Sequence, residues 1–204
     1  MARGQLFING RGEPQLLLDD GRKVEIEGER SPSGAAFVLL IDCSGSMSDK
    51  IVQAREGAMD FVKRALGESA SVGVVTFDSH AKLLAEPSLD LPTISRAIAE
   101  ARIAGSTNMA DGITLAERIL GEHSPRTIVL VTDGRPDDRD KALEASESAR
   151  IRDVNIYCIG VDGADQEFLR IIATTEEMAK KVSAKDLHAA LFAAADTLLL
   201  GGKY

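Results

Sequence analysis

The 204-residue chain has no tryptophan, two cysteines and six prolines, and aromatic residues make up only 4% of it. Cys43 and Cys158 are too few for a disulfide framework and lack the close spacing of zinc-binding pairs, so we interpret them as reduced interior residues. No uncharged apolar run approaches the roughly 20 residues that span a bilayer, and residues 1–12 lack the apolar core of a signal peptide. We therefore expect a soluble, cytoplasmic protein that does not contact a membrane.

Positive charge is also scarce. The chain has 24 lysines and arginines against 32 aspartates and glutamates, a formal net charge of −8. Nucleic-acid binding as the main activity is disfavoured, because it depends on neutralising phosphates with basic side chains. With 44% hydrophobic residues, the chain can form one α/β domain with a substantial core, but not two full domains.

Strand-like and helix-like segments alternate along most of the chain. The continuous apolar run from Ala36 to Ile41 is typical of a strand that is covered on both faces in a parallel sheet. Apolar residues then recur at helical spacing from Ile51 to Ala65, and Gly67 is a helix-stop signal. Further strands are predicted at 71–77, 81–85, 127–132, 154–159 and 177–182, the last of them at an edge of the sheet. Further helices are predicted at 92–102, 109–120, 137–150, 165–173 and 184–200. Ser183 and Asp186 are expected to cap the last helix. The alternation predicts an α/β fold, a doubly wound, mostly parallel sheet with helices on both faces.

The first 34 residues follow another pattern. Residues 5–8, 15–18 and 23–27 look like short strands, with a hairpin-type turn at 19–21 and a linker at 31–34. We therefore divide the chain into a β-rich extension at 1–34 and the α/β domain at 35–204. Two roles stay open for the extension: covering a sheet edge, or forming a homodimer.

Oxygen-bearing side chains gather where strands of the predicted sheet end. Asp42, Ser44 and Ser46 follow the first core strand at alternate positions, Asp133 follows a later strand, and Thr107 stands in a loop before a helix. Ligands of doubly wound sheets bind beyond the carboxyl ends of the strands. Five oxygens without nitrogen or sulfur suit a hard cation, Mg²⁺ or Mn²⁺ rather than zinc, whereas Ca²⁺ would prefer more carboxylates. If the hydroxyls bind the ion directly and the acids act partly through water, the ion stays electrophilic and can accept an Asp or Glu from a partner.

Simpler interpretations exist for each of these residues. Ser44, Ser46 and Thr107 could cap helices, and Asp133 could belong to a turn. The joint occurrence of five such oxygens at matching strand ends favours the metal site. Asp111 could orient a metal ligand, or it could be an ordinary first-turn carboxylate favoured by the helix dipole. We also expect Asp42 and Asp133 to lie on a rim outside the core, so that replacing them leaves the fold nearly intact.

Taken together, Asp42-x-Ser44-x-Ser46, Thr107 before a helix and Thr132-Asp133-Gly134 after a strand resemble the metal-ion-dependent adhesion site of von Willebrand factor A and integrin inserted domains. The resemblance covers roughly residues 35–200. It implies a six-stranded sheet of order 3-2-1-4-5-6 with an antiparallel third strand, which would place Asp42 and Asp133 on adjacent strands. It also implies metal-mediated protein binding without catalysis. The sequence shows neither a secretion signal nor paired cysteines, which disfavours the extracellular adhesion role. For an intracellular member of this family, the resemblance implies a role as an adaptor.

Two other functions compete with this one. A metal-dependent phosphatase or other hydrolase could use Asp42, but the haloacid dehalogenase pattern needs a second Asp where Ser44 stands, and a serine hydrolase needs Gly-x-Ser-x-Gly with a His base. Alternatively, the ion could be purely structural and staple the loops of a scaffold together.

Overall fold

The computed structural model describes residues 4–8, 14–18, 23–25 and 34–201, with side chains for residues 34–199. The chain divides into two units, Met1–Ser33 and Gly34–Tyr204. The first unit holds an antiparallel sheet in the order of its strands, β1 (Gly4–Ile8), β2 (Pro14–Leu18) and β3 (Lys23–Glu25). These strands coincide with the short ones that the sequence predicts, whereas the turn at 19–21 and most of the linker at 31–34 lie outside the described residues.

The second unit is built on a six-stranded sheet in the order β6-β5-β4-β7-β8-β9. Its strands are β4 (Ala36–Asp42), β5 (Ser71–Phe77), β6 (Ala81–Ser88), β7 (Arg126–Thr132), β8 (Val154–Val161) and β9 (Ala179–Val182). Neighbouring strands run parallel, except that β6 pairs antiparallel with β5. Counted from the first core strand, this is the order 3-2-1-4-5-6 with an antiparallel third strand, so the fold prediction is confirmed.

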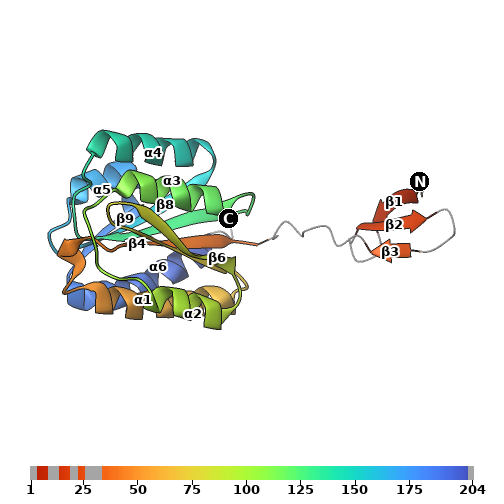
Figure 1. Ribbon diagram of the computed structural model, residues 1–204, viewed down its shortest axis with the longest axis horizontal. Helices are drawn as coiled ribbons and strands as arrows, with labels where there is room; N and C mark the ends of the chain where they lie inside the picture. The colour runs from red at the N-terminus through yellow and green to blue at the C-terminus, as the bar shows by residue number, and fades with distance from the viewer. Residues whose placement is uncertain (1–3, 9–13, 19–22, 26–33, 202–204) are drawn as a thin grey trace. The chain divides into compact units, whose positions relative to one another are not determined.

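Helices cover both faces of this sheet (Figure 1). They are α1 (Ile51–Gly67), α2 (Leu91–Ala99), α3 (Met109–Leu120), α4 (Arg139–Ile151), α5 (Gln166–Ile172) and α6 (Leu187–Gly201). Four of them begin where a side chain accepts a hydrogen bond from a backbone N–H three residues further on, which satisfies a donor that the first turn leaves unpaired. The capping residues are Asp90, Asn108, Asp138 and Asp165.

The predicted capping of the last helix by Ser183 and Asp186 is wrong. The hydroxyl of Ser183 donates to the carboxylate of Asp186 at 2.5 Å, so the two side chains bind each other. The backbone N–H of Ala184 donates instead to Asp162, which follows β8. A short 3₁₀ turn, Ala184–Asp186, precedes α6.

The central strand β4 divides the core into two layers, because successive side chains of a strand point to opposite faces. Phe37, Leu39 and Ile41 pack in the layer that contains the buried side chains of α1, α2 and α6. Ala36, Val38 and Leu40 pack in the layer formed with α3, α4 and α5. Burying each large apolar side chain contributes about 1.5–3 kcal/mol, so the doubly covered sheet fixes the position of the loops at its ends.

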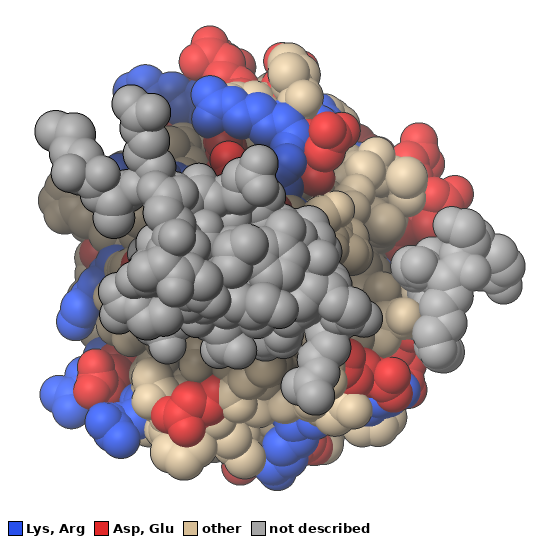
Figure 2. All heavy atoms as spheres, turned by 90° about the vertical axis from the view of Figure 1, so that its right-hand side faces the viewer, with Lys and Arg blue, Asp and Glu red and all other residues tan. Residues whose placement is uncertain are grey.

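None of the helices that the structure describes is long and apolar enough to cross a membrane. On the face drawn in Figure 2, the coloured part of the surface shows lysine and arginine side chains next to acidic ones, without an extended area of either sign.

Candidate metal centre

The candidate site lies where the polypeptide leaves β4 and β7. These strands are adjacent and parallel, with Ile41 opposite Val131, so Asp42 and Thr132 stand at the same edge of the sheet. The chain continues from β4 into α1 on one face and from β7 into α4 on the other face (Figure 1). The two loops therefore diverge at a topological switch point, the usual position of a ligand site in this class of sheet.

Asp42 forms the floor of the site. Its side chain is fully buried, Oδ1 accepts a hydrogen bond from the backbone N–H of Ser44 at 2.8 Å, and Oδ2 accepts one from Oγ1 of Thr132 at 2.5 Å. Burial raises the pKa of this carboxyl, although the hydrogen bonds from Ser44 and Thr132 act to lower it. The expectation that Asp42 and Asp133 lie on a rim outside the core is therefore wrong, because Asp42 is held by buried donors and Asp133 is buried as well, with 8% of its surface exposed.

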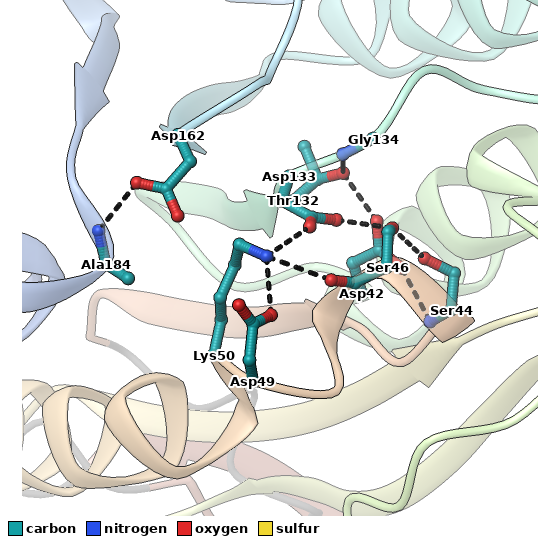
Figure 3. A network of polar contacts seen from close by, with 10 residues as sticks. All are labelled: Asp42, Ser44, Ser46, Asp49, Lys50, Thr132, Asp133, Gly134, Asp162 and Ala184. Atoms are coloured by element: carbon teal, nitrogen blue, oxygen red, sulfur yellow. Dashed lines mark hydrogen bonds and ion pairs between the residues drawn. The ribbon is translucent and has the colours of Figure 1, made fainter.

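Three further oxygens follow one another across the site (Figure 3). Ser44 Oγ lies 3.2 Å from Ser46 Oγ, and Ser46 Oγ donates to Oδ1 of Asp133 at 2.6 Å. Adjacent ligands of an octahedral Mg²⁺ ion are about 3 Å apart, because its bonds of roughly 2.0–2.1 Å meet at right angles. The two separations bracket this value, so the three oxygens, which hydrogen bonds join here, also have the spacing of adjacent ligands of one small cation.

Thr107 reaches the site from another loop. Its backbone N–H donates to Oδ2 of Asp137 at 3.0 Å, and the N–H of Asp137 donates to the Thr107 carbonyl at 3.0 Å. A Cβ built on Gly134 would lie 3.7 Å from both Oγ1 of Thr107 and Oγ of Ser46. The structure thus brings all the residues of the predicted metal site, Asp42, Ser44, Ser46, Thr107 and Asp133, to one end of the sheet.

The capping alternatives are not supported where the structure describes these residues. Ser44 precedes the 3₁₀ turn Gly45–Met47, yet its side chain makes no capping hydrogen bond. Asn108, and not Thr107, caps α3 by accepting from the N–H of Asp111. Asp111 lies in the first turn of α3, which agrees with the interpretation of it as a first-turn carboxylate. Its carboxylate also accepts a hydrogen bond from the N–H of Ala81 at 2.7 Å, and this bond joins the helix to the start of β6. Helix capping therefore does not account for the hydroxyls of Ser44 and Thr107.

Lys50 is a member of the site that the sequence reasoning missed. Its Nζ lies 3.1 Å from Oδ2 of Asp133 and 2.6 Å from Oδ1 of Asp49, and it donates to the carbonyl of Ser46 at 3.0 Å (Figure 3). The hydrogen bonds that Lys50 donates to Asp49 and to Asp133 raise the pKa of Lys50, although burial acts to lower it. Lys50 is a cation and not an oxygen ligand, so a pattern of oxygen donors does not include it. Its position four residues after Ser46, about one helical turn, could have indicated that the two residues lie close together.

The donor chemistry narrows the choice of ion. In the part of the chain that the structure describes, no group of three or more His, Cys, Asp or Glu side chains is placed to hold a metal. The candidate set is instead three hydroxyls with two acids, all of them oxygen donors. Such a set fits Mg²⁺ or Mn²⁺, which accept few carboxylates and retain water, better than zinc or calcium.

Fold and loops together define a doubly wound α/β domain with a hydroxyl-and-acid cluster at its switch point. The chain matches the von Willebrand factor type A domain over residues 37–193 and belongs to that family. It is 25% identical over 164 residues to a von Willebrand factor A domain-containing protein of Dictyostelium discoideum. The aligned region covers 72% of this chain and 18% of that protein. It is also 42% identical over 67 residues to human matrilin-4, 33% of this chain and 10% of that one.

Among solved structures, the vWF domain of the type V pili tip protein Mfa5 from Porphyromonas gingivalis has the same fold. It superimposes with a TM-score of 0.77 at 15% identity, over 83% of this chain and 96% of that domain. The chain spans less than a fifth of the length of the two relatives above. These comparisons identify a domain of a protein-interaction and adhesion family.

Proposed function

We propose that this domain binds one divalent cation, in the first place Mg²⁺, through Asp42, Ser44, Ser46, Thr107 and Asp133, and uses it to bind an acidic side chain of a protein partner. The observation that carries the proposal is the row of oxygens Ser44 Oγ, Ser46 Oγ and Asp133 Oδ1, spaced 3.2 and 2.6 Å apart. Helix capping does not account for the Ser44 hydroxyl.

The residues divide the work as follows. Asp42, held by Ser44 and Thr132, supplies negative charge from a buried position. The hydroxyls of Ser44, Ser46 and Thr107 supply neutral ligands, and Asp133 supplies the second charge. A bound ion with few anionic ligands is a Lewis acid, so a carboxylate from outside becomes its preferred additional ligand.

The competing hydrolase gains no support from the position of Asp42. A nucleophilic carboxylate must approach its substrate, but this side chain is fully buried, and both its oxygens accept hydrogen bonds within the protein. We therefore propose a non-enzymatic role. The intracellular adaptor role, the cytoplasmic location and a homodimer through residues 1–34 stay predictions from the sequence.

An experiment with Mn²⁺ separates a binding ion from a structural one. Mn²⁺ that keeps exchangeable water in its coordination shell strongly enhances the relaxation of water protons. We expect the full chain to produce this enhancement at one site, and we expect added acetate, a minimal carboxylate, to reduce it by displacing water from the bound ion.

The matched controls come from the same loop. Ser46→Ala removes a proposed ligand and should weaken the Mn²⁺ signal at a given protein concentration, whereas Ser48→Ala, two residues further on and also exposed, should leave it unchanged. An enhancement that acetate does not alter would show that the bound ion does not accept an external carboxylate, whereas Mn²⁺ that binds without enhancing water relaxation would indicate a closed, structural ion. The absence of any protein-bound Mn²⁺ signal would refute the proposed site.

A further inference from the structure

Lys50 makes contacts that a surface lysine does not usually have. Its side chain is only 11% exposed, and the side chain of Asp133 beside it is 5% exposed. The ammonium contacts the carboxylates of Asp49 and Asp133 and the carbonyl of Ser46, so its three N–H donors have three oxygen partners. By comparison, Lys63, within the chain's first long helix α1, is 61% exposed and pairs only with Asp60 among the contacts that the structure describes.

The two oxygens of Asp133 are thereby divided between different partners. Oδ1 accepts from the hydroxyl of Ser46, a proposed metal ligand, and Oδ2 pairs with Lys50 at 3.1 Å. An ammonium and a divalent cation that share one carboxylate repel each other, and water screens this repulsion poorly at so little exposure. Lys50 is the residue before α1, four positions after Ser46, and its hydrogen bond to the Ser46 carbonyl holds the ammonium beside the loop.

We propose that Lys50 is a built-in counter-ion of the site, which holds Asp133 in place when no metal is bound and limits the affinity for the metal. Its charge cancels one of the two acids of the site, Asp42 and Asp133. With a divalent ion bound, the sum over these two acids, Lys50 and the ion is one positive charge instead of zero; Asp49, the other acid beside Lys50, has a side chain that is 75% exposed, so water screens its charge. The lysine therefore increases the preference of the site for an external carboxylate while it keeps the ion exchangeable. This inference rests on the proposed function, because it concerns the same cation.

The test uses Lys50→Gln, which retains an amide donor but removes the charge, and Lys50→Arg, which keeps the charge. Lys63→Gln is the matched control on α1. Calorimetry with Mg²⁺ alone should show about tenfold tighter binding or more for Lys50→Gln than for the wild type. Lys50→Arg and Lys63→Gln should bind Mg²⁺ within about twofold of the wild type, the range in which a screened surface charge acts.

A second measurement, thermal unfolding, tests the role of Lys50 in the metal-free protein. In excess chelator, Lys50→Gln should unfold at a lower temperature than the wild type, because Asp133 loses its counter-ion, and Lys63→Gln should not. Added Mg²⁺ should then raise the midpoint of Lys50→Gln more than that of the wild type.

The outcomes distinguish the two proposals. Wild-type binding with equal or weaker binding by Lys50→Gln would overturn the counter-ion role and leave the metal site standing. Loss of Mg²⁺ binding in all variants would overturn the metal site, and the chelator measurement would still decide whether Lys50 holds Asp133. Unchanged stability of Lys50→Gln in chelator would contradict the role of Lys50 in the metal-free protein.

Discussion

Oγ1 of Thr132 donates a 2.5 Å hydrogen bond to Oδ2 of Asp42, and this bond joins the ends of the adjacent strands β7 and β4. Both residues are fully buried. The same hydroxyl oxygen accepts from the backbone N–H of Gly134 at 3.2 Å. One threonine thus orients the acid at the floor of the candidate site and the loop that carries the second acid, Asp133.

Replacing this threonine should cost both stability and metal affinity. Thr132→Val keeps the shape of the side chain but leaves Oδ2 of Asp42 without its donor, which should destabilise the protein by about 1–3 kcal/mol. Urea unfolding in chelator measures this. Thr114→Val, an exposed threonine on α3 whose hydroxyl donates to Ala110 within the helix, should change stability by less than about 0.5–1 kcal/mol. Equal losses of stability in the two variants would show that the hydrogen bond between Thr132 and Asp42 contributes no more to stability than the exposed hydroxyl of Thr114.

The fold was predictable from the sequence to a large degree because its pattern is local. The buried strand at 36–41 and the helical spacing from Ile51 are set by neighbouring side chains, and the structure has both within a residue or two. The start of the last helical segment was predicted wrongly, because the N–H of Ala184 donates to Asp162, a residue 22 positions earlier in the sequence. Residues that support the site, such as Lys50 and Asp137, were missed because their roles depend on which loops the folded sheet brings together.

Thr107→Ala should separate metal binding from carboxylate binding. The backbone of Thr107 makes two hydrogen bonds with Asp137, one to its carboxylate and one from its N–H, so the loop should keep its place when the hydroxyl is removed. We expect Mn²⁺ to bind with reduced but measurable affinity, and acetate to displace less of its water than in the wild type. Retention of the full acetate effect at matched Mn²⁺ occupancy would remove Thr107 from the site.

The loop before Thr107 requires a glycine at position 105. Gly105 has φ +54°, and a Cβ there would clash with Oγ of Ser79 and lie 2.9 Å from the backbone nitrogen of the same residue. Gly105→Ala should destabilise the protein by at least about 1–2 kcal/mol, the cost of a left-handed conformation for a residue with a Cβ. Thermal unfolding compares it with Gly67→Ala at the end of α1, where a Cβ would meet nothing within 4 Å and where stability should stay the same or rise. A Gly105→Ala variant as stable as the wild type would contradict this description of the loop.

The ion pair between Arg139 and Asp165 should make stability depend on pH in a known direction. The hydrogen bond from Arg139, at 2.7 Å, lowers the pKa of Asp165 below its ordinary value of 3.8, and the N–H of Phe168 acts in the same direction. The unfolded state then takes up the proton more readily, so the stabilisation is complete above pH 3.8 and is lost as the pH falls through the lowered pKa. Urea unfolding should show the wild type more stable than Asp165→Asn at neutral pH, with the difference shrinking below pH 3.8. A difference that is independent of pH would contradict a contribution from the charge of Asp165, because Asn also provides the helix cap and differs from Asp in lacking the charge.

Titration of Mg²⁺ into the full chain, followed by calorimetry, tests the central claim most directly. The account predicts binding of one ion per chain to the wild type and to Ser48→Ala, and at least about tenfold weaker binding to Ser46→Ala, as expected when an inner ligand is lost. Absence of binding by the wild type, or equal binding by Ser46→Ala, would contradict the assignment of these oxygens to a metal ion.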